Sequence, residues 1–144
     1  MTSIRRFNAA PDGDYRWEAV DLLRYKEADA APFRDVTRQV LFAQPDQGCE
    51  LRYFEVAPNG HSTLERHQHT HAVLILRGRG TVQIGGEVHP LAEHDLVTID
   101  PMTWHQFHAA PEAALGFLCL VASKRDKPQL PSGEERAALA PSGP

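Results

Sequence analysis

Histidine is concentrated in one part of this 144-residue chain, and that part carries the residues best suited to chemistry. All eight histidines lie between positions 61 and 108, and the densest stretch reads Glu65-Arg66-His67-Gln68-His69-Thr70-His71. Alternate side chains of an extended strand share one face, so Glu65 and the three histidines of this stretch would point the same way until a turn breaks the alternation. Imidazoles and a carboxylate on one face form a site for divalent Fe, Mn, Ni, Cu or Zn.

A histidine tract can also be a solvent-facing strand that holds metal only weakly and serves no function. The residues that follow favour a true site. The stretch passes directly into the apolar run from Ala72 to Leu76, which ends near Gly78 and Gly80. The polar cluster therefore adjoins what reads as a core strand.

The elements that must position these histidines read as short strands. Apolar runs rich in Val, Ile, Phe and Tyr recur between turn residues, at 38–43, 50–57, 72–76, 81–84, 87–91, 96–99 and 116–122. Gly85-Gly86 separates two of these runs and supplies the positive φ of a two-residue hairpin turn. This spacing predicts an all-β sandwich or barrel. The stretch from Arg16 to Tyr25 fits neither period and is left open as strand or short helix.

The whole chain sets further limits. Its 144 residues and 42% apolar content suit one domain. A net charge of −4 without a long block of one sign predicts neither a nucleic-acid nor a membrane partner. No apolar run approaches 18 residues, and the basic N-terminus is followed by Pro11-Asp12-Gly13-Asp14, not by an apolar run, so we expect neither a membrane span nor a signal peptide. Cys49 and Cys119 lack the spacing of a zinc or redox motif, so we expect reduced thiols in a cytoplasmic protein.

The histidine-rich stretch resembles the first metal-binding motif of the cupin superfamily. That motif carries two histidine ligands as His-x-His, a glutamate ligand three or four residues on, and a glycine after six more. Counting back from Gly78 puts His71 at the glutamate position, His67 at the second histidine position and Glu65 at the first. The resemblance thus implies Glu65, His67 and His71 as ligands, with the glutamate and one histidine exchanged.

The motif can also be aligned with the chain in a second register. Counting forward from His67 and His69 places Val73 at the glutamate position, with Gly80 as the glycine. We prefer the first register because valine cannot bind a metal. His69 then lies in the turn between strands, either beside the site as an alternate ligand or supporting group, or facing solvent.

The second cupin motif carries a glycine, a proline, a glycine, a metal-binding histidine and an asparagine. The comparable stretch is 94–107, where His105 and the strand-turn-strand outline survive. The resemblance implies His105 as the fourth ligand; the other interpretation is a histidine that only packs beside Trp104 and Phe107. The usual glycine, proline, glycine and asparagine positions hold His94, Asp100, Met102 and Ala109.

The resemblance covers roughly residues 50–121 and implies a single cupin β-barrel, a jelly roll or double-stranded β-helix with flexible N- and C-terminal segments. We place the barrel at 36–123, an N-terminal segment at 1–35 that adds strands or a dimer contact, and a polar, disordered tail at 124–144. The resemblance further implies a homodimer with one divalent ion per chain. The ligand set is Glu65, His67, His71 and His105, with His69 as the alternate.

The function that we predict is that of a metal-binding cupin acting on or binding a small organic molecule. A dioxygenase-type reaction is favoured, because this ligand set leaves coordination positions open for substrate and O₂. A non-catalytic binding or sensing role, and an isomerase or decarboxylase, remain alternatives, and a storage role is the least favoured. No catalytic residue is assigned.

The sequence assigns no role to the other polar residues. In the last strand Phe117, Cys119 and Val121 share one of two apolar faces, and we expect one of those faces to line the barrel. Arginine on a strand is mostly exposed, so no substrate contact is assigned to Arg52, Tyr53 or Arg77. The same holds for the remaining histidines, His61, His89, His94 and His108.

Overall fold

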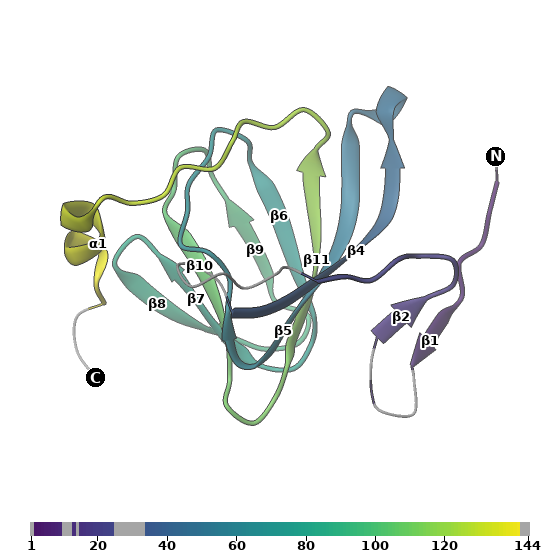
Figure 1. Cartoon of the computed structure of the whole chain (residues 1–144), viewed down its shortest axis with the longest axis horizontal. Coiled ribbons are helices and arrows are strands. Elements are labelled where there is room, and N and C mark those ends of the chain that lie inside the picture. The colour runs from purple at the N-terminus through teal and green to yellow at the C-terminus, as the bar shows by residue number, and fades with distance from the viewer. Residues whose placement is uncertain (1, 10–12, 14, 25–33, 142–144) are drawn as a thin grey trace.

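The computed structural model describes residues 2–9, 13, 15–24 and 34–141 (Figure 1). Within them one antiparallel sheet runs in the order β8-β7-β10-β5-β11-β6-β9, with β4 paired to β5 and β3 paired to β4. The strands of this sheet are β3 Leu23–Arg24, β4 Arg34–Gln44, β5 Cys49–His61, β6 His71–Arg77, β7 Gly80–Ile84, β8 Glu87–Leu91, β9 Leu96–Ile99, β10 His105–Ala109 and β11 Leu115–Ala122. The all-β prediction is confirmed.

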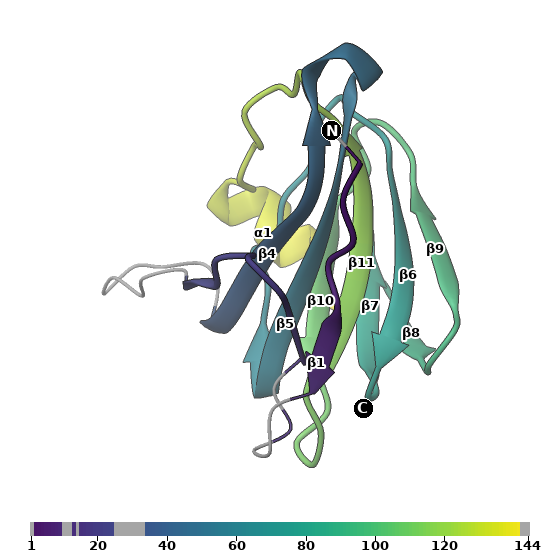
Figure 2. The same cartoon turned by 90° about the vertical axis from the view of Figure 1, so that its right-hand side faces the viewer.

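The sheet curls, so that its two halves face one another (Figure 1). Figure 2 shows β4, β5, β11, β6 and β9 following one another around one side. Strands β7, β8 and β10 form the other side. One passage of the chain between the halves is the tight connection from β6 to β7, where Gly78 has a φ of 79° and a side chain would collide with the carbonyl oxygen of Ala114. Glycine is required there both for its conformation and for its size.

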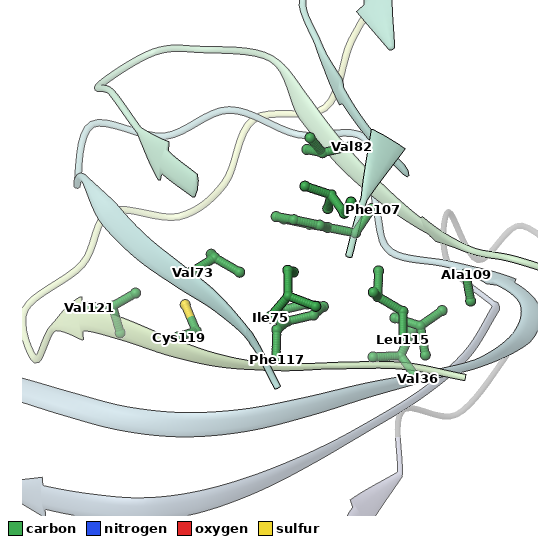
Figure 3. Close-up of a cluster of buried hydrophobic side chains, with 12 residues drawn as sticks. Val36, Val73, Ile75, Val82, Phe107, Ala109, Leu115, Phe117, Cys119 and Val121 are labelled. Carbon is green, nitrogen blue, oxygen red and sulfur yellow. The ribbon is translucent and has the colours of Figure 1, made fainter. Parts of the chain in front are cut away.

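The core lies between the two halves. Val82 and Phe107 come from one side, and Ile75 and Phe117 come from the other (Figure 3). The rings of Phe107 and Phe117 stack with their centroids 4.7 Å apart. Along β10 the alternate residues His105, Phe107 and Ala109 are buried, which is the period-2 pattern of a strand with one inward face.

The predicted hairpin around Gly85-Gly86 is present. Strands β7 and β8 pair from Ile84 opposite Glu87 to Gly80 opposite Leu91. Gly85 has a φ of 59°, as a two-residue turn of this kind requires. Strand β10, which the apolar runs had not marked out separately, pairs with β7 along its whole length.

The N-terminal segment contributes strands. A hairpin of β1 Phe7–Ala9 and β2 Tyr15–Trp17 rests on the buried ring of Tyr53, with Tyr15 and Trp17 at 5.9 and 5.1 Å between ring centroids. The stretch that we left open as strand or helix is therefore strand at β2 and β3, with a turn between; Tyr25 lies outside the described residues. Strand β3 extends the sheet through β4.

The chain after β11 differs from the disordered tail that we expected. Gln129 pairs with Arg66 as an isolated bridge, and the short helix α1 Gly133–Leu139 lies on the β8–β10 side, opposite the β1–β2 hairpin (Figure 1). Ser132 and Glu135 form a capping box at its start, and Gln83 Nε2 donates a hydrogen bond to the Leu139 carbonyl at 2.8 Å. These contacts supply the order that the polar composition alone does not indicate.

A 3₁₀ turn, η1 Pro45–Gln47, joins β4 to β5. Among the described residues no helix has the length and apolar character needed to cross a bilayer.

Candidate metal centre

Three histidines converge at one end of the barrel. His67 lies in the connection between β5 and β6, His71 is the first residue of β6, and His105 is the first residue of β10. One potential ligand atom from each lies within 4.8 Å of the others. Their ring centroids are 4.9 to 5.0 Å apart. This spacing suits three imidazoles around a single divalent ion.

The backbone holds the connection with His67 against the start of β10. Glu65 and His105 exchange backbone hydrogen bonds of 3.2 and 3.0 Å, and the Met102 N–H donates to the His67 carbonyl at 2.7 Å. The two metal-binding segments are therefore fixed to one another, although they lie far apart in the sequence. An alternating strand through Glu65, His69 and His71 is not what forms: the chain bends at Gln68 and His69.

Hydrogen bonds determine which ring nitrogen of each histidine is free. His67 Nδ1 donates to the His69 carbonyl and His105 Nδ1 donates to the Thr103 carbonyl, both at 2.8 Å. In a neutral imidazole the second nitrogen, Nε2, then carries the lone pair. His71 Nε2 is buried without any hydrogen-bond partner. A buried polar atom without a partner is costly unless something else binds it, and a metal ion would do so.

Burial also keeps these imidazoles in the form that binds a metal. Desolvation, reinforced by the neighbouring histidines, lowers the pKa of His71 to about 3. Desolvation lowers the pKa of His105 to about 4, against a weaker opposing effect of the hydrogen bond to Thr103. Burial lowers the pKa of His67 as well. Neutral imidazoles at ordinary pH, with Nδ1 tethered and Nε2 free, fit a divalent ion.

Glu65 lies beside this cluster but outside it. Its backbone is directly opposite His105, so both side chains point to the same face and both line the pocket. Burial raises the pKa of the Glu65 carboxyl to about 7, against the opposing charge of Arg52. Within the described part of the chain, the group with mutually close ligand atoms comprises the three histidines without Glu65. Its place as a fourth ligand stays a prediction.

His69 supports the cluster from the side. Its ring stacks on that of His67 with centroids 3.7 Å apart and planes 4° from parallel. His69 Nδ1 lies 3.0 Å from Asp126 Oδ1, and the backbone N–H groups of Gln68 and His69 also donate to the Asp126 carboxylate. These hydrogen bonds, with that from Gln68 the largest, lower the pKa of Asp126 to about 2. Sequence reasoning missed Asp126 because it belongs to the expected tail.

The cluster opens into a pocket of about 330 Å³. Its apolar wall includes Val36, Phe54, Phe107 and Phe117. Cys119 also lines the pocket. Phe117, Cys119 and Val121 all belong to the buried core, so theirs is the face of the last strand that lines the barrel, although Val121 does not reach the pocket. The remaining lining residues are polar or lie at the C-terminal side, namely Arg52, Ser62, Thr63, Arg125, Asp126 and Pro128.

Cys119 brings a thiol to the metal cluster. The side chain is buried, and its Sγ lies 3.3 Å from His71 Nδ1 and 4.0 Å from Arg52 Nη2. Burial raises the pKa of the thiol, while the charge of Arg52 opposes that rise. Both described cysteines are free, as expected. The sequence offered no signal for this contact, because Cys119 and His71 meet only through the pairing of β6 with β11.

The three strand residues that were weighed for substrate contact separate into two groups. Tyr53 is buried outside the pocket with its hydroxyl donating to Glu55 at 2.8 Å, and Arg77 also binds Glu55. Arg52 instead lines the pocket, contrary to the exposed position expected for it. Its side chain points inward because it shares a register position with Cys119 on the neighbouring strand.

Comparisons with known proteins agree with this architecture. The cupin domain family (Cupin_2) matches residues 52–121. A Rhodospirillum rubrum protein named 1-methylthio-D-xylulose 5-phosphate methylsulfurylase is 60% identical over 125 residues, which are 87% of this chain and 80% of that protein.

Two crystal structures are similar along most of their length. A cupin-2 domain protein from Rhodospirillum rubrum has 60% identity and a TM-score of 0.83, with 86% of this chain and 83% of that chain covered. A cupin 2 conserved barrel domain protein from Rhodopseudomonas palustris has 50% identity and a TM-score of 0.86, with 94% and 90% covered.

Proposed function

This chain belongs to the cupin family, and on that premise we propose that it is a metal-dependent enzyme that removes the methylthio group from a 1-methylthio ketose phosphate. The proposal draws on the relative named 1-methylthio-D-xylulose 5-phosphate methylsulfurylase, which is 60% identical. The observation in this chain that carries it is the buried Cys119 thiol in the wall of the metal pocket, 3.3 Å from His71.

The histidines at 67, 71 and 105 would hold the ion, one per chain, with Glu65 as the candidate fourth ligand. A divalent ion bound there would supply Lewis acidity to the carbonyl oxygen of the ketose. The apolar wall around the cluster would keep water from the reacting carbon. The neutral state of the histidines at ordinary pH supports this assignment.

Cys119 would act as the nucleophile on sulfur. With Nε2 of His71 facing the cluster, its Nδ1 carries the ring proton and donates toward Sγ. This hydrogen bond and the charge of Arg52 stabilise the thiolate against the burial that raises the pKa of the thiol. The thiolate attacks the methylthio sulfur, forming an S–S bond and breaking the bond from sulfur to C1. The electron pair passes into the adjacent ketone as an enolate, which takes up a proton at C1. The products are a 1-deoxy ketose phosphate and a methyl disulfide on Cys119.

A low-molecular-weight thiol would regenerate the enzyme. Its thiolate attacks the methyl-bearing sulfur, and Cys119 leaves as its thiolate. The external thiol departs as its methyl disulfide, so that the two electrons needed to replace the methylthio group by hydrogen come from the thiol. Arg125, Asp126 and Pro128 of the C-terminal segment line the pocket, and such a thiol would approach past them.

The experiment uses metal-loaded protein, 1-methylthio-D-xylulose 5-phosphate and dithiothreitol, with the 1-deoxy product followed by NMR. We expect wild-type protein to form the product and Cys119→Ser to form none while it keeps its metal. Cys49→Ser is the matched control and should retain activity, because Cys49 lies at the start of β5 and does not line the pocket. Without dithiothreitol, the methyl disulfide should accumulate on Cys119 and be seen by mass spectrometry.

Two results would contradict the proposal. Wild-type protein with a full complement of metal that forms no 1-deoxy product would refute the activity. Cys119→Ser with wild-type turnover would refute the role of the thiol.

A dioxygenase-type reaction is the second candidate, favoured by three neutral imidazoles that leave coordination positions open. Oxygen uptake by the Fe(II)-loaded protein, tested with small acids, thiols and diketones, would support it. Isomerase or decarboxylase chemistry and a non-catalytic binding role would show substrate binding without oxygen uptake or a 1-deoxy product.

We also propose a homodimer in the cytoplasm, as the family resemblance and the two free cysteines suggest. Light scattering of purified protein tests the dimer, and a monomer at micromolar concentration would contradict it.

A further inference from the structure

Arg52 places a guanidinium in the wall of the metal pocket. Its residue lies on β5 between Cys119 of β11 and Val40 of β4. The guanidinium carbon sits 4.9 Å from the centroid of the Phe54 ring, and Nη2 lies 4.0 Å from Cys119 Sγ. Its Nε is buried and has no hydrogen-bond partner. The side chain is thus held over an aromatic ring with most of its donors unused.

The charge of Arg52 acts on the Glu65 carboxyl of the same pocket, whose pKa it lowers against the effect of burial, but the two side chains do not form an ion pair. Among the described residues Arg52 forms no ion pair. The other guanidinium of the pocket, that of Arg125, is bound to Glu50 at 2.8 Å and to the Ala122 carbonyl at 2.9 Å. The carboxylate of Asp126 is engaged by His69 and two backbone N–H groups. Arg52 is therefore the cation of this pocket that is left for a ligand.

A partly buried cation with unused hydrogen-bond donors is suited to bind an anion. Arginine cannot lose its proton in a protein and carries five N–H donors in a planar fork. The fork matches two oxygens of a phosphate or carboxylate, and such charge-assisted pairs are among the strongest hydrogen bonds in proteins. The aromatic contact with Phe54 reduces the freedom of the side chain before the anion arrives.

We propose that Arg52 binds the phosphate of the substrate and thereby selects phosphorylated over unphosphorylated ketoses. The identity of the anion rests on the proposed function. The pocket offers a partner for both polar ends of a ketose phosphate, the histidine cluster for the carbonyl and Arg52 for the phosphate. Because Nη2 of Arg52 lies 4.0 Å from Cys119 Sγ, the bound sugar would curve around the thiol to reach both partners. Arg52 is a specificity-determining residue in this scheme, and the thiol chemistry remains with Cys119.

The test measures binding without turnover. D-xylulose 5-phosphate and D-xylulose are titrated into metal-loaded wild-type protein and Arg52→Gln by calorimetry, with inorganic phosphate as a further probe. We expect wild-type protein to prefer the phosphorylated sugar, and Arg52→Gln to lose that preference by about 10- to 100-fold, the range for hydrogen bonds to a charged group. Affinity for D-xylulose should change by less than about threefold.

Two further variants keep the test interpretable. Arg52→Lys keeps the charge without the planar fork and should show an intermediate preference. Arg79→Gln removes an exposed arginine paired with Glu112 and should behave as wild type. Metal content and melting temperature, measured for each variant, show whether the cluster and the fold are intact.

Several outcomes would overturn the inference. One is wild-type protein that binds both sugars with equal affinity. The others are an Arg52→Gln variant that keeps the preference for the phosphorylated sugar, or one whose affinity falls equally for both sugars. Because neither sugar carries a methylthio group, a phosphate preference that depends on Arg52, together with no 1-deoxy product, would refute the proposed reaction alone. Product formation with unchanged phosphate preference in Arg52→Gln would refute the role of Arg52 alone.

Discussion

Two groups of histidines in this barrel differ in burial and in hydrogen bonding. The inner histidines are His67, His71 and His105, and the outer pair is His61 and His108. His105 and His108 belong to the same strand, β10, yet His105 is only 3% exposed and His108 is partly exposed on the other face. Because the two residues are three positions apart, their side chains point to opposite faces of the strand. One faces the metal pocket, and the other is partly exposed.

The hydrogen bonds of the two groups explain the difference further. Each inner ring has its Nδ1 engaged and its Nε2 directed to no protein partner that the structure records. In the outer pair, His108 Nε2 contacts Gln106 Oε1 at 3.0 Å, and His61 Nδ1 lies 3.0 Å from the Ser62 carbonyl. The two outer rings stand 5.5 Å apart and have no third imidazole in the described structure. The candidate metal site therefore depends on the meeting of the β5–β6 connection, β6 and β10, and not on the number of histidines nearby.

The largest expected effect separates the two groups by metal binding. His105→Ala should reduce a near-stoichiometric metal content to almost none, with affinity at least about 100-fold lower, because losing a ligand exceeds the 10- to 100-fold effect of losing a supporting group. His108→Ala, on the same strand, should keep the metal. Metal analysis of untagged, dialysed protein measures both. Equal loss in the two variants would remove the distinction between inner and outer histidines.

Acid should destabilise the metal-free protein through the inner histidines. The pKa of His71 is about 3 and that of His105 about 4 in the folded protein, whereas both are near 6.5 when unfolded. Between these values the unfolded chain binds more protons, so the free energy of unfolding falls as pH decreases from 6.5 toward 4. Each histidine contributes up to about 1.4 kcal/mol per pH unit.

Urea unfolding after chelator treatment, at pH 7 and pH 5, measures this slope. His71→Ala should show a shallower loss of stability than wild type. His108→Ala should change the slope less, because that ring is less deeply buried. An unchanged slope in His71→Ala would contradict the burial of a neutral imidazole at this position.

Glu65 should show the opposite pH dependence in the metal-free protein. Its pKa is raised from 4.5 to about 7, so the favourable contribution of the neutral acid is complete below pH 4.5 and is lost as pH rises through 7. Glu65→Gln avoids that loss, and its stability relative to wild type should increase between pH 4.5 and pH 8 by on the order of 3 kcal/mol. Urea unfolding at the two values tests it.

The exposed Glu87, beside His89, is the control, since Glu87→Gln should show no such change. The same Glu65→Gln protein also tests the fourth ligand. Metal affinity that falls with the substitution assigns Glu65 to the ion, and unchanged affinity removes it from the predicted set.

The smallest expected effect concerns the support of His67 by its neighbours. Asp126→Asn weakens the hydrogen bonds that hold His69 against the His67 ring. We expect metal affinity to fall by about tenfold or less, the lower end for groups that orient a ligand. Competition with a chelator measures it, with Glu134→Gln on the exposed face of α1 as the control. A loss as large as that of His105→Ala would make His69 a ligand and favour the second register.

Local signals predicted much of the fold. The Gly85-Gly86 pair between two short apolar runs predicted the β7–β8 hairpin correctly. Turn conformation and side-chain alternation depend only on neighbouring residues, so they can be read from the sequence. The end of the chain was harder to predict. Ser132 and Glu135 have the spacing of a capping box, but the polar composition around them dominated the interpretation, and the contacts that order the segment come from Arg66 and Gln83.

The candidate site shows the same division. The sequence alone predicted His67, His71 and His105 as metal ligands. The prediction came from the glycine after β6 and from the cupin resemblance. Only the tertiary structure decided that the ligand atoms of these three meet with Glu65 beside them, and that Cys119, Arg52 and Asp126 surround them. The physical reason is that these neighbours come from β11, β5 and the C-terminal segment, and strand pairing and sheet curvature, which no local pattern encodes, bring them together.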